Sequence, residues 1–228
     1  MNYNNEYFVL RLITEAALLM IAGRSGKIYL YALMTINLLL VPVFGQKLFE
    51  IFGIITNGGN VFYATAILCL AMLIEKYGMT EFKNILGYAV FSMVGYIIMA
   101  NISHYIIGTN SISEHINIVF SFVPRIMLAS LSSFIISACA FVWMYNYFKK
   151  KFPNEYLFRL INTVVIVQFI DSMFFFILAF WGEIPYRILA VALLYGFLVK
   201  SVASIVLIPF VSFGLRKSIS IKNILIKT

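Results

Sequence analysis

The chain has 228 residues, of which 62% are hydrophobic, 17% aromatic and only 11% charged. Soluble domains have about 45–50% apolar and about 25% charged residues. A chain this short cannot bury so much apolar surface away from water, so the composition predicts an integral membrane protein. The net charge of +8 does not indicate nucleic-acid binding, because the basic residues occur in short clusters between apolar runs and at the C-terminus.

The apolar runs predict an all-α transmembrane bundle of about six or seven spans, forming one membrane domain over residues 1–228. A crossing needs about 20 mostly apolar residues, and runs of this kind cover residues 6–22, 28–44, 59–75, 84–107, 117–147, 158–181 and 187–213. The first run is the weakest, because it is short and carries Arg11 and Glu15. The fifth is too long for one straight crossing, and Pro124 is expected to divide it.

The basic residues of the connections alternate between the two sides of the predicted bundle. One set of connections, with the C-terminal tail, carries 11 of them, and the opposite set carries 2, Lys47 and Arg187. The 11 are Arg24, Lys27, Lys76, Lys83, Lys149, Lys150, Lys151, Arg216, Lys217, Lys222 and Lys227. Because basic loops favour the cytoplasmic side, we expect a multi-pass protein of a prokaryotic cell membrane, with the N-terminus outside and the C-terminus in the cytoplasm.

Three polar residues occur in the middle of the last two predicted spans. Gln168 and Asp171 are three residues apart and therefore share one helix face, while Lys200 is at a similar depth in the next, antiparallel span. A charge at the bilayer centre costs roughly 2.5–3.5 kcal/mol, so it usually faces a partner or a cavity. Two readings follow: a buried ion pair that holds the bundle together, or a polar cavity near the midplane that binds a solute. The two readings are compatible.

Other charged residues are closer to the ends of the predicted spans. Glu75 ends the third span and is either a solvated helix end or part of a site. Arg125 follows Pro124 and either reaches toward the interface or belongs to a site or gate. Arg11 and Glu15 are four residues apart and are expected to neutralise each other.

No motif in the sequence indicates catalysis or a cofactor. Cys69 and Cys139 lie inside apolar runs without CxxC spacing, and His104 and His115 lack a third ligand at zinc spacing. There is no Walker motif for ATP hydrolysis and no HExxH. We therefore expect no enzyme activity, no metal and no cofactor.

Five segments, in this order and spacing, resemble one known family. They are "NGGNVFYA" (57–64), "EKYG" (75–78), "PRIMLAS" (124–130), "LFRLINTVVIVQFIDSMFFFILAF" (157–180) and "LVKSVASIVLIP" (198–209). The chain resembles the queuosine precursor transporters, formerly called vitamin uptake transporters. The resemblance implies a small helical membrane protein that imports a 7-deazapurine such as preQ0, preQ1 or queuine.

The resemblance also implies which residues bind the substrate. The positions that match the family are Glu75, Arg125, Ser130, Arg159, Gln168, Asp171, Lys200 and Pro209, and of these we expect Asp171, Gln168, Lys200, Arg125, Glu75 and Arg159 to bind substrate. Several polar positions of the family are apolar here, namely Ala71, Ala138, Phe141, Leu160 and Ile161. The resemblance therefore implies a divergent member and leaves the base open.

A purine base suits the polar residues of the sixth predicted span. A guanine-like edge has adjacent N–H and NH2 donors, and a carboxylate such as Asp171 accepts both. Gln168 is expected to contact a neighbouring carbonyl or ring nitrogen. Phe174–Phe176 and Tyr195 either provide an aromatic wall for the base or contact lipid.

The sequence thus predicts import of a small heterocyclic solute by alternating access around a midplane site. The expected partners are this solute and the lipid bilayer, with a homodimer left open. One alternative is the substrate-binding subunit of an energy-coupling-factor importer, which needs partner subunits. Another is a membrane scaffold that transports nothing.

Overall fold

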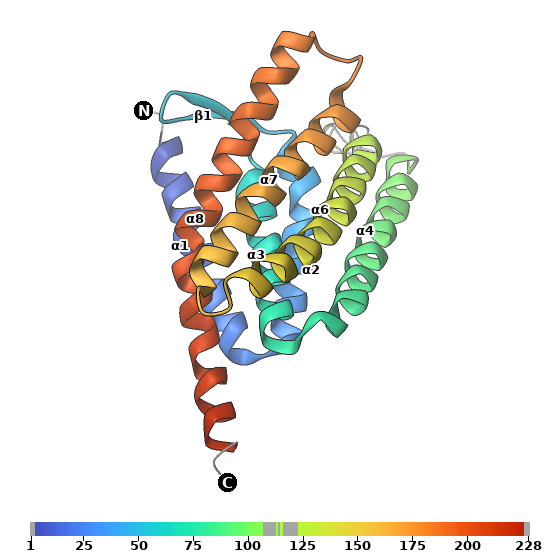
Figure 1. Ribbon diagram of the computed structural model, residues 1–228. Helices are drawn as coiled ribbons and strands as arrows, with labels where there is room; N and C mark the ends of the chain where they lie inside the picture. The colour runs from blue at the N-terminus through green and yellow to red at the C-terminus, as the bar shows by residue number, and fades with distance from the viewer. Residues whose placement is uncertain (1–2, 107–112, 114, 116–122, 226–228) are drawn as a thin grey trace.

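The computed structural model describes residues 3–106, 113, 115 and 123–225, and these form a bundle of long helices (Figure 1). The long helices are α1 (Asn4–Ser25), α2 (Lys27–Gly45), α3 (Asn60–Tyr77), α4 (Phe82–His104), α6 (Val123–Lys151), α7 (Tyr156–Phe180) and α8 (Tyr186–Leu225). A short 3₁₀ helix, η1 (Met79–Glu81), leads into α4, and the strands β1 (Leu48–Ile51) and β2 (Ile54–Asn57) connect α2 to α3.

Six helical segments of the described residues are long and apolar enough to cross a membrane. They are α2, α3, η1 with α4, α6 from Pro124, α7, and α8 as far as Leu215. The predicted all-α transmembrane bundle is therefore confirmed. Helix α1 is not among the six, although it lies along α8 within the bundle (Figure 1).

The helix boundaries follow the predicted spans to within a few residues, except at two places. Pro124 lies in the first turn of α6, where a missing backbone N–H breaks no helical hydrogen bond. The residues that the sequence assigned to the start of this span, 117–122, lie outside the described part of the chain. Helix α8 continues beyond the predicted end at 213.

The β-hairpin between α2 and α3 is a feature that the sequence analysis treated as a loop. Its strands pair antiparallel, with Ile51 opposite Ile54. The two residues of the turn, Phe52 and Gly53, have φ angles of 47° and 77°, as a tight two-residue hairpin turn requires. Asn5 at the start of α1 accepts a hydrogen bond from the backbone N–H of Phe52 at 2.9 Å, so the hairpin is tied to α1.

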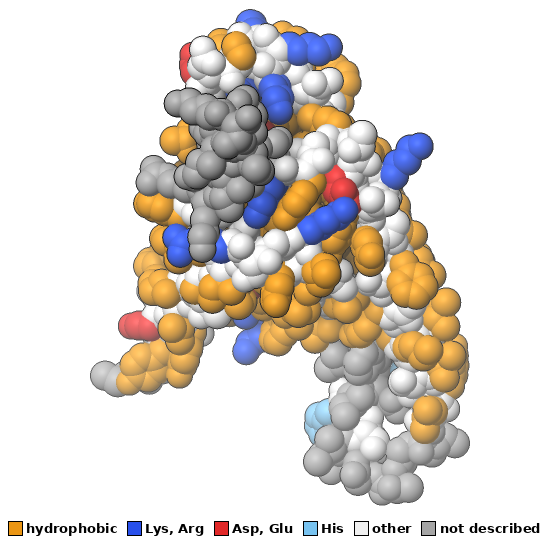
Figure 2. Space-filling view, turned by 90° about the horizontal axis from the view of Figure 1, so that it is seen from below, with side chains coloured by type: hydrophobic (Ala, Val, Ile, Leu, Met, Phe, Trp, Pro, Cys, Tyr) orange, Lys and Arg blue, Asp and Glu red, His pale blue; other side chains and the backbone are white. Residues whose placement is uncertain are grey.

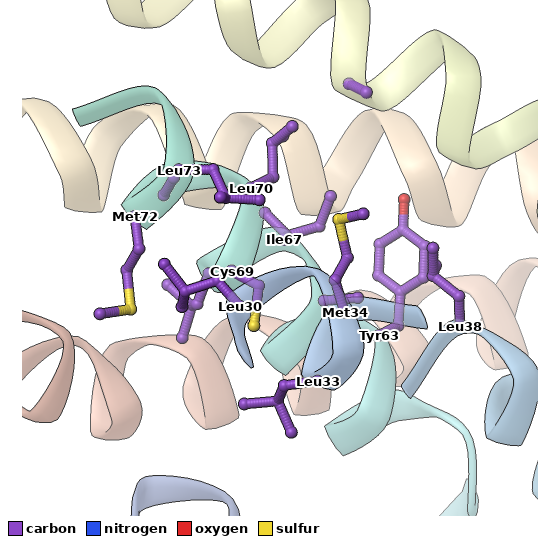
Figure 3. Packing of buried hydrophobic residues seen from close by; sticks show 14 of the residues in the cluster. Leu30, Leu33, Met34, Leu38, Tyr63, Ile67, Cys69, Leu70, Met72 and Leu73 are labelled. Carbon is purple, nitrogen blue, oxygen red and sulfur yellow. The ribbon is translucent and has the colours of Figure 1, made fainter. Parts of the chain in front are cut away.

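Helix α3 is the centre of the bundle. Its side chains are buried from Asn60 to Ile74. Figure 3 shows Ile67, Cys69 and Leu70 of α3 among the side chains of the neighbouring helix α2. Because α3 has neighbours on every side, a polar group on any face of this helix is removed from lipid and from water.

Helices α1 and α8 approach each other closely at a pair of glycines. A Cβ atom built on Gly23 would lie 3.1 Å from the Cα of Gly214 and 2.2 Å from the end of the Met72 side chain. Lipid tails are as apolar as leucine side chains, so helices in a membrane associate through close packing of this kind rather than through the hydrophobic effect.

The basic connections gather at one end of the bundle. The α1–α2, α3–α4 and α6–α7 connections all lie at the lower end in Figure 1, and Figure 2 shows Lys and Arg side chains over this end. Lys47, in the connection between α2 and β1, and Arg187, in the first turn of α8, lie at the opposite end. The fold thus separates the two sets of loops as the sequence indicated.

The contact between Gly23 and Gly214 generates a stability prediction. Gly23→Leu should lower the free energy of unfolding by about 1–3 kcal/mol, because the added side chain would force α1 away from α8. Thermal unfolding of the purified protein in detergent measures this loss. The control is Gly95→Leu on α4, where no neighbouring atom lies within 4 Å of the new Cβ. Equal melting temperatures for the two variants would contradict the prediction.

Candidate functional site

Asp171 of α7 and Lys200 of α8 form a buried ion pair in the middle of the bundle. The ammonium Nζ of Lys200 donates to Oδ2 of Asp171 at 2.5 Å, and the two residues are 4% and 1% exposed. The same Nζ lies 4.7 Å from the ring centroid of Tyr63 and 5.3 Å from that of Phe175. Two electron-rich ring faces thus add to the stabilisation of the buried ammonium.

A small cavity lies against this ion pair. Its volume is ≈ 10 Å³, which is room for about one water molecule. Besides the pair, its polar lining comes from Asn57 of β2, Asn60 and Tyr63 of α3, and Ser130 and Ser133 of α6. Phe175 of α7 supplies an aromatic wall. The ion pair that the sequence offered as one reading is present, and a small cavity lies beside it.

Several polar atoms around the cavity have no hydrogen-bond partner among the described residues. They include Oδ1 of Asp171, the hydroxyl of Tyr63, Oγ of Ser130 and Oδ1 of Asn60. The Tyr63 hydroxyl faces Asp171 and Ser137, but without completing a hydrogen bond of normal geometry. Buried polar groups are almost always hydrogen-bonded, so this set indicates a place that receives a polar ligand or water.

Gln168 lies one helical turn from Asp171 on α7, and it faces α8 rather than the cavity. Its Nε2 donates to Oγ of Ser204 at 3.0 Å, and its Oε1 has no partner among the described residues. Gln168 does not belong to the cavity lining. It continues the polar contact between α7 and α8 that the ion pair begins.

Glu75 and Arg159 meet in a second polar cluster at the basic end of the bundle. Oε2 of Glu75 accepts a hydrogen bond from the Tyr145 hydroxyl at 2.6 Å, and Oε1 lies 3.7 Å from Nη2 of Arg159. Arg159 is only 4% exposed and also donates to the carbonyls of Phe152 and Pro153. The cluster thus joins α3 to α6, α7 and the loop between those two helices.

Arg125 lies at the other end of the bundle. Its guanidinium pairs with Glu183 and donates to the carbonyl oxygen of Trp181 at 3.0 Å. Both side chains of the ion pair are largely exposed. Arg125 therefore connects the start of α6 to the connection between α7 and α8. It does not line the cavity beside Asp171 and Lys200.

Residues 57–214, which include Asp171, Lys200 and most of the cavity lining, match the family described as putative vitamin uptake transporter. The chain belongs to this family. The match runs from the end of β2 to α8, so it contains both end clusters and every residue of the cavity except Val41 and Gly45.

One protein related to this chain is the probable queuosine precursor transporter of Bacillus subtilis (strain 168). The two sequences are 25% identical over 223 residues, which cover 95% of this chain and 96% of the relative. The resemblance to queuosine precursor transporters is therefore confirmed. No solved structure matches the chain.

Of the six residues expected to bind substrate, the fold brings two to the central cavity. Asp171 and Lys200 line it, Gln168 is one turn away, Glu75 and Arg159 form the cluster at the basic end, and Arg125 is at the opposite end. The sequence analysis did not single out Asn60, Tyr63 and Ser133. Their signal was helical spacing, because Asn60 and Tyr63, like Ser130 and Ser133, are three residues apart and share a face.

Arg11 and Glu15 interact electrostatically, as expected, but they form no direct ion pair among the described residues. Nη1 of Arg11 instead donates to the carbonyl oxygen of Gly58 at 2.7 Å, and the guanidinium lies 4.5 Å from the ring centroid of Phe62. The close approach of the α2–α3 connection to α1 provides this alternative partner. Glu15 points into the bundle, with 5% of its surface exposed.

The central ion pair predicts a non-additive loss of stability. Asp171→Asn or Lys200→Met alone should cost about 3–5 kcal/mol, because each leaves a buried charge unpaired. The double variant should recover most of that loss. The measurement is a double-mutant cycle on unfolding in detergent. As a control, Arg125→Met and Glu183→Gln should each cost about 1 kcal/mol or less, since that pair is exposed. Additive losses at Asp171 and Lys200 would mean that the two charges do not stabilise each other.

Proposed function

We propose that this protein imports a queuosine precursor, a 7-deazapurine such as preQ0, preQ1 or queuine, and that the base binds at the cavity beside Asp171 and Lys200. The observation that carries the proposal is Oδ1 of Asp171, a buried carboxylate oxygen without a hydrogen-bond partner in the described structure. The name of the Bacillus subtilis relative supports the choice of substrate. The work of the protein is then binding and movement rather than catalysis.

The polar groups of the cavity match the edge of a guanine-like base. Such an edge has adjacent N–H and NH2 donors, and both Oδ1 of Asp171 and Oδ1 of Asn60 are free to accept. The hydroxyls of Tyr63 and Ser130 are available to a carbonyl or ring nitrogen of the base. Phe175 gives the flat ring a surface to stack on.

We infer an alternating-access mechanism from the small size of the cavity. At ≈ 10 Å³ it is too small for a two-ring heterocycle, so the helices around it must separate to admit the base. The Glu75–Arg159 cluster closes the basic end, and the Arg125–Glu183 pair with the β-hairpin closes the other. Opening one end at a time would expose the midplane site to one side of the membrane at a time.

The substrate assignment predicts base-specific uptake by this chain alone. Purified protein in proteoliposomes should take up at least one of labelled preQ0, preQ1 and queuine. Asp171→Asn should weaken apparent affinity about 10- to 150-fold, because a charge-assisted hydrogen bond contributes about 1.5–3 kcal/mol. Glu6→Gln, an exposed carboxylate-to-amide change on α1, is the matched control.

Two outcomes of the uptake experiment would reject the proposal. One is the absence of uptake of all three bases by folded wild-type protein, which would favour a chain that needs partner subunits. The other is unchanged affinity in Asp171→Asn, which would remove this carboxylate from the binding site.

We also propose that the basic end of the bundle faces the cytoplasm, following the asymmetry of Lys and Arg. Single cysteines can be placed at Glu50 in the hairpin and at Lys150 at the basic end, with Cys69 and Cys139 replaced by alanine. A membrane-impermeant maleimide added to intact cells should label Glu50→Cys and leave Lys150→Cys unlabelled until the cells are lysed. The reverse pattern would invert the orientation.

A further inference from the structure

Glu15 is a buried carboxylate outside the base cavity. It projects from α1 toward α2 and α3, where Nδ2 of Asn37 donates to its Oε2 at 3.4 Å and the hydroxyl of Thr65 faces it. Asn37 is 1% exposed and Thr65 is fully buried. The thiol of Cys69, one turn from Thr65 on α3, also interacts electrostatically with the carboxylate.

Glu15 differs from the other buried carboxylates of the described residues in its lack of an ion pair. Asp171 pairs with Lys200 at 2.5 Å, and Glu81 pairs with Lys27 at 2.8 Å. Arg11, one turn from Glu15 on the same helix, donates to the carbonyl oxygen of Gly58 and lies over the ring of Phe62 instead. An ionised carboxylate without a cation is costly in such surroundings, and it usually takes up a proton instead.

The two neighbours of Glu15 provide acceptors for that proton. Oδ1 of Asn37 and Oγ1 of Thr65 are buried and have no hydrogen-bond partner among the described residues. An amide oxygen is an acceptor only, so it cannot bond to an ionised carboxylate. A protonated carboxyl group has one O–H donor, which Oδ1 of Asn37 can accept, while the Thr65 hydroxyl can donate to the carboxyl group in either state. Protonation of Glu15 therefore supplies the donor that Oδ1 of Asn37 lacks.

We propose that Glu15 binds the proton that this transporter moves together with its base, an inference that rests on the transport function proposed above. The proton enters Glu15 from one side of the membrane and leaves it to the other, and the base crosses in the same cycle. No covalent bond of the base is made or broken.

Helix α3 connects the proton site to the base cavity. Thr65 faces Glu15, while Tyr63 and Asn60 on the same helix line the cavity. Helix α1 also contacts α8, which carries Lys200, through the close approach of Gly23 to Gly214. Loss of the proton would place an unpaired charge between α1, α2 and α3, and this charge would favour separation of these helices to admit water.

Few other groups influence the titration of Glu15. Arg11 is the charged group that acts on it, from one turn away on its own helix. Helix α3 presents Thr65 and Cys69, and α2 presents the neutral Asn37. No charged residue of the described part of α8 enters these surroundings. Changes of pH should therefore act on this pocket mainly through Glu15 itself.

Gradient-driven uptake tests the proposal. Proteoliposomes with the membrane potential clamped at zero receive an inward proton gradient of one pH unit. One proton per base supports about tenfold accumulation of labelled base. The wild type and the control Glu6→Gln should approach this ratio. Glu15→Gln should show none of the accumulation while still exchanging internal for external base, since exchange needs no net proton movement. Glu15→Asp, which keeps a titratable group, should retain coupling.

Three results would overturn the proposal: accumulation by Glu15→Gln equal to that of the wild type, loss of accumulation and exchange together in a folded Glu15→Gln, or accumulation driven by a sodium gradient alone. Infrared spectroscopy distinguishes a failure of the proposed proton site from a failure of the proposed transport function. The carbonyl band of a protonated carboxylic acid should be present in wild-type protein at neutral pH and missing in Glu15→Gln. If the band is present but no base is transported, Glu15 remains the proton-binding residue and the proposed substrate is rejected. If the band is absent, the proposal that Glu15 binds a proton is rejected.

Discussion

The ion pair between Asp171 and Lys200 is the interaction on which the centre of the bundle depends. Lipid cannot solvate either charge, and each would cost roughly 2.5–3.5 kcal/mol at the bilayer centre. Pairing at 2.5 Å and the ring of Tyr63 offset this cost. Only one carboxylate oxygen of Asp171 is used, because Lys200 occupies Oδ2 and leaves Oδ1 bare. The same contact therefore holds α7 to α8 and keeps an acceptor available.

Close helix packing surrounds this centre. Glycine allows the approach at Gly23 and Gly214, and a Cβ on Gly196 of α8 would lie 2.5 Å from the ring of Phe176 on α7. The polar side chains of α3 and α6 then meet across a space of ≈ 10 Å³. The polar atoms that lack a hydrogen-bond partner among the described residues border this space, which has room for about one water molecule.

Composition and apolar length were sufficient to predict the helical bundle, because both follow from the thickness of the bilayer. The pairing of Asp171 with Lys200 was also accessible, since both are charged and lie at matching depths in consecutive spans. The partners of Arg11 were not, because Gly58 and Phe62 reach it only after the chain has folded back between α2 and α3. The hairpin was missed for a local reason: its turn places Phe52 at a positive φ, a conformation that phenylalanine seldom adopts.

The two end clusters and the central pair connect different helices, and this division suits a protein that opens at one end at a time. At the basic end, Glu75 of α3 is bonded to α6 and α7 through Tyr145 and Arg159. At the other end, Arg125 joins α6 to the α7–α8 connection. Separation of α3 from α6 and α7 would break the first cluster and leave the second intact. Asp171 lies on α7 and Lys200 on α8, so neither residue belongs to α3. Their ion pair therefore need not break when α3 separates from α6 and α7, and neither charge is exposed to lipid without its partner while the site opens.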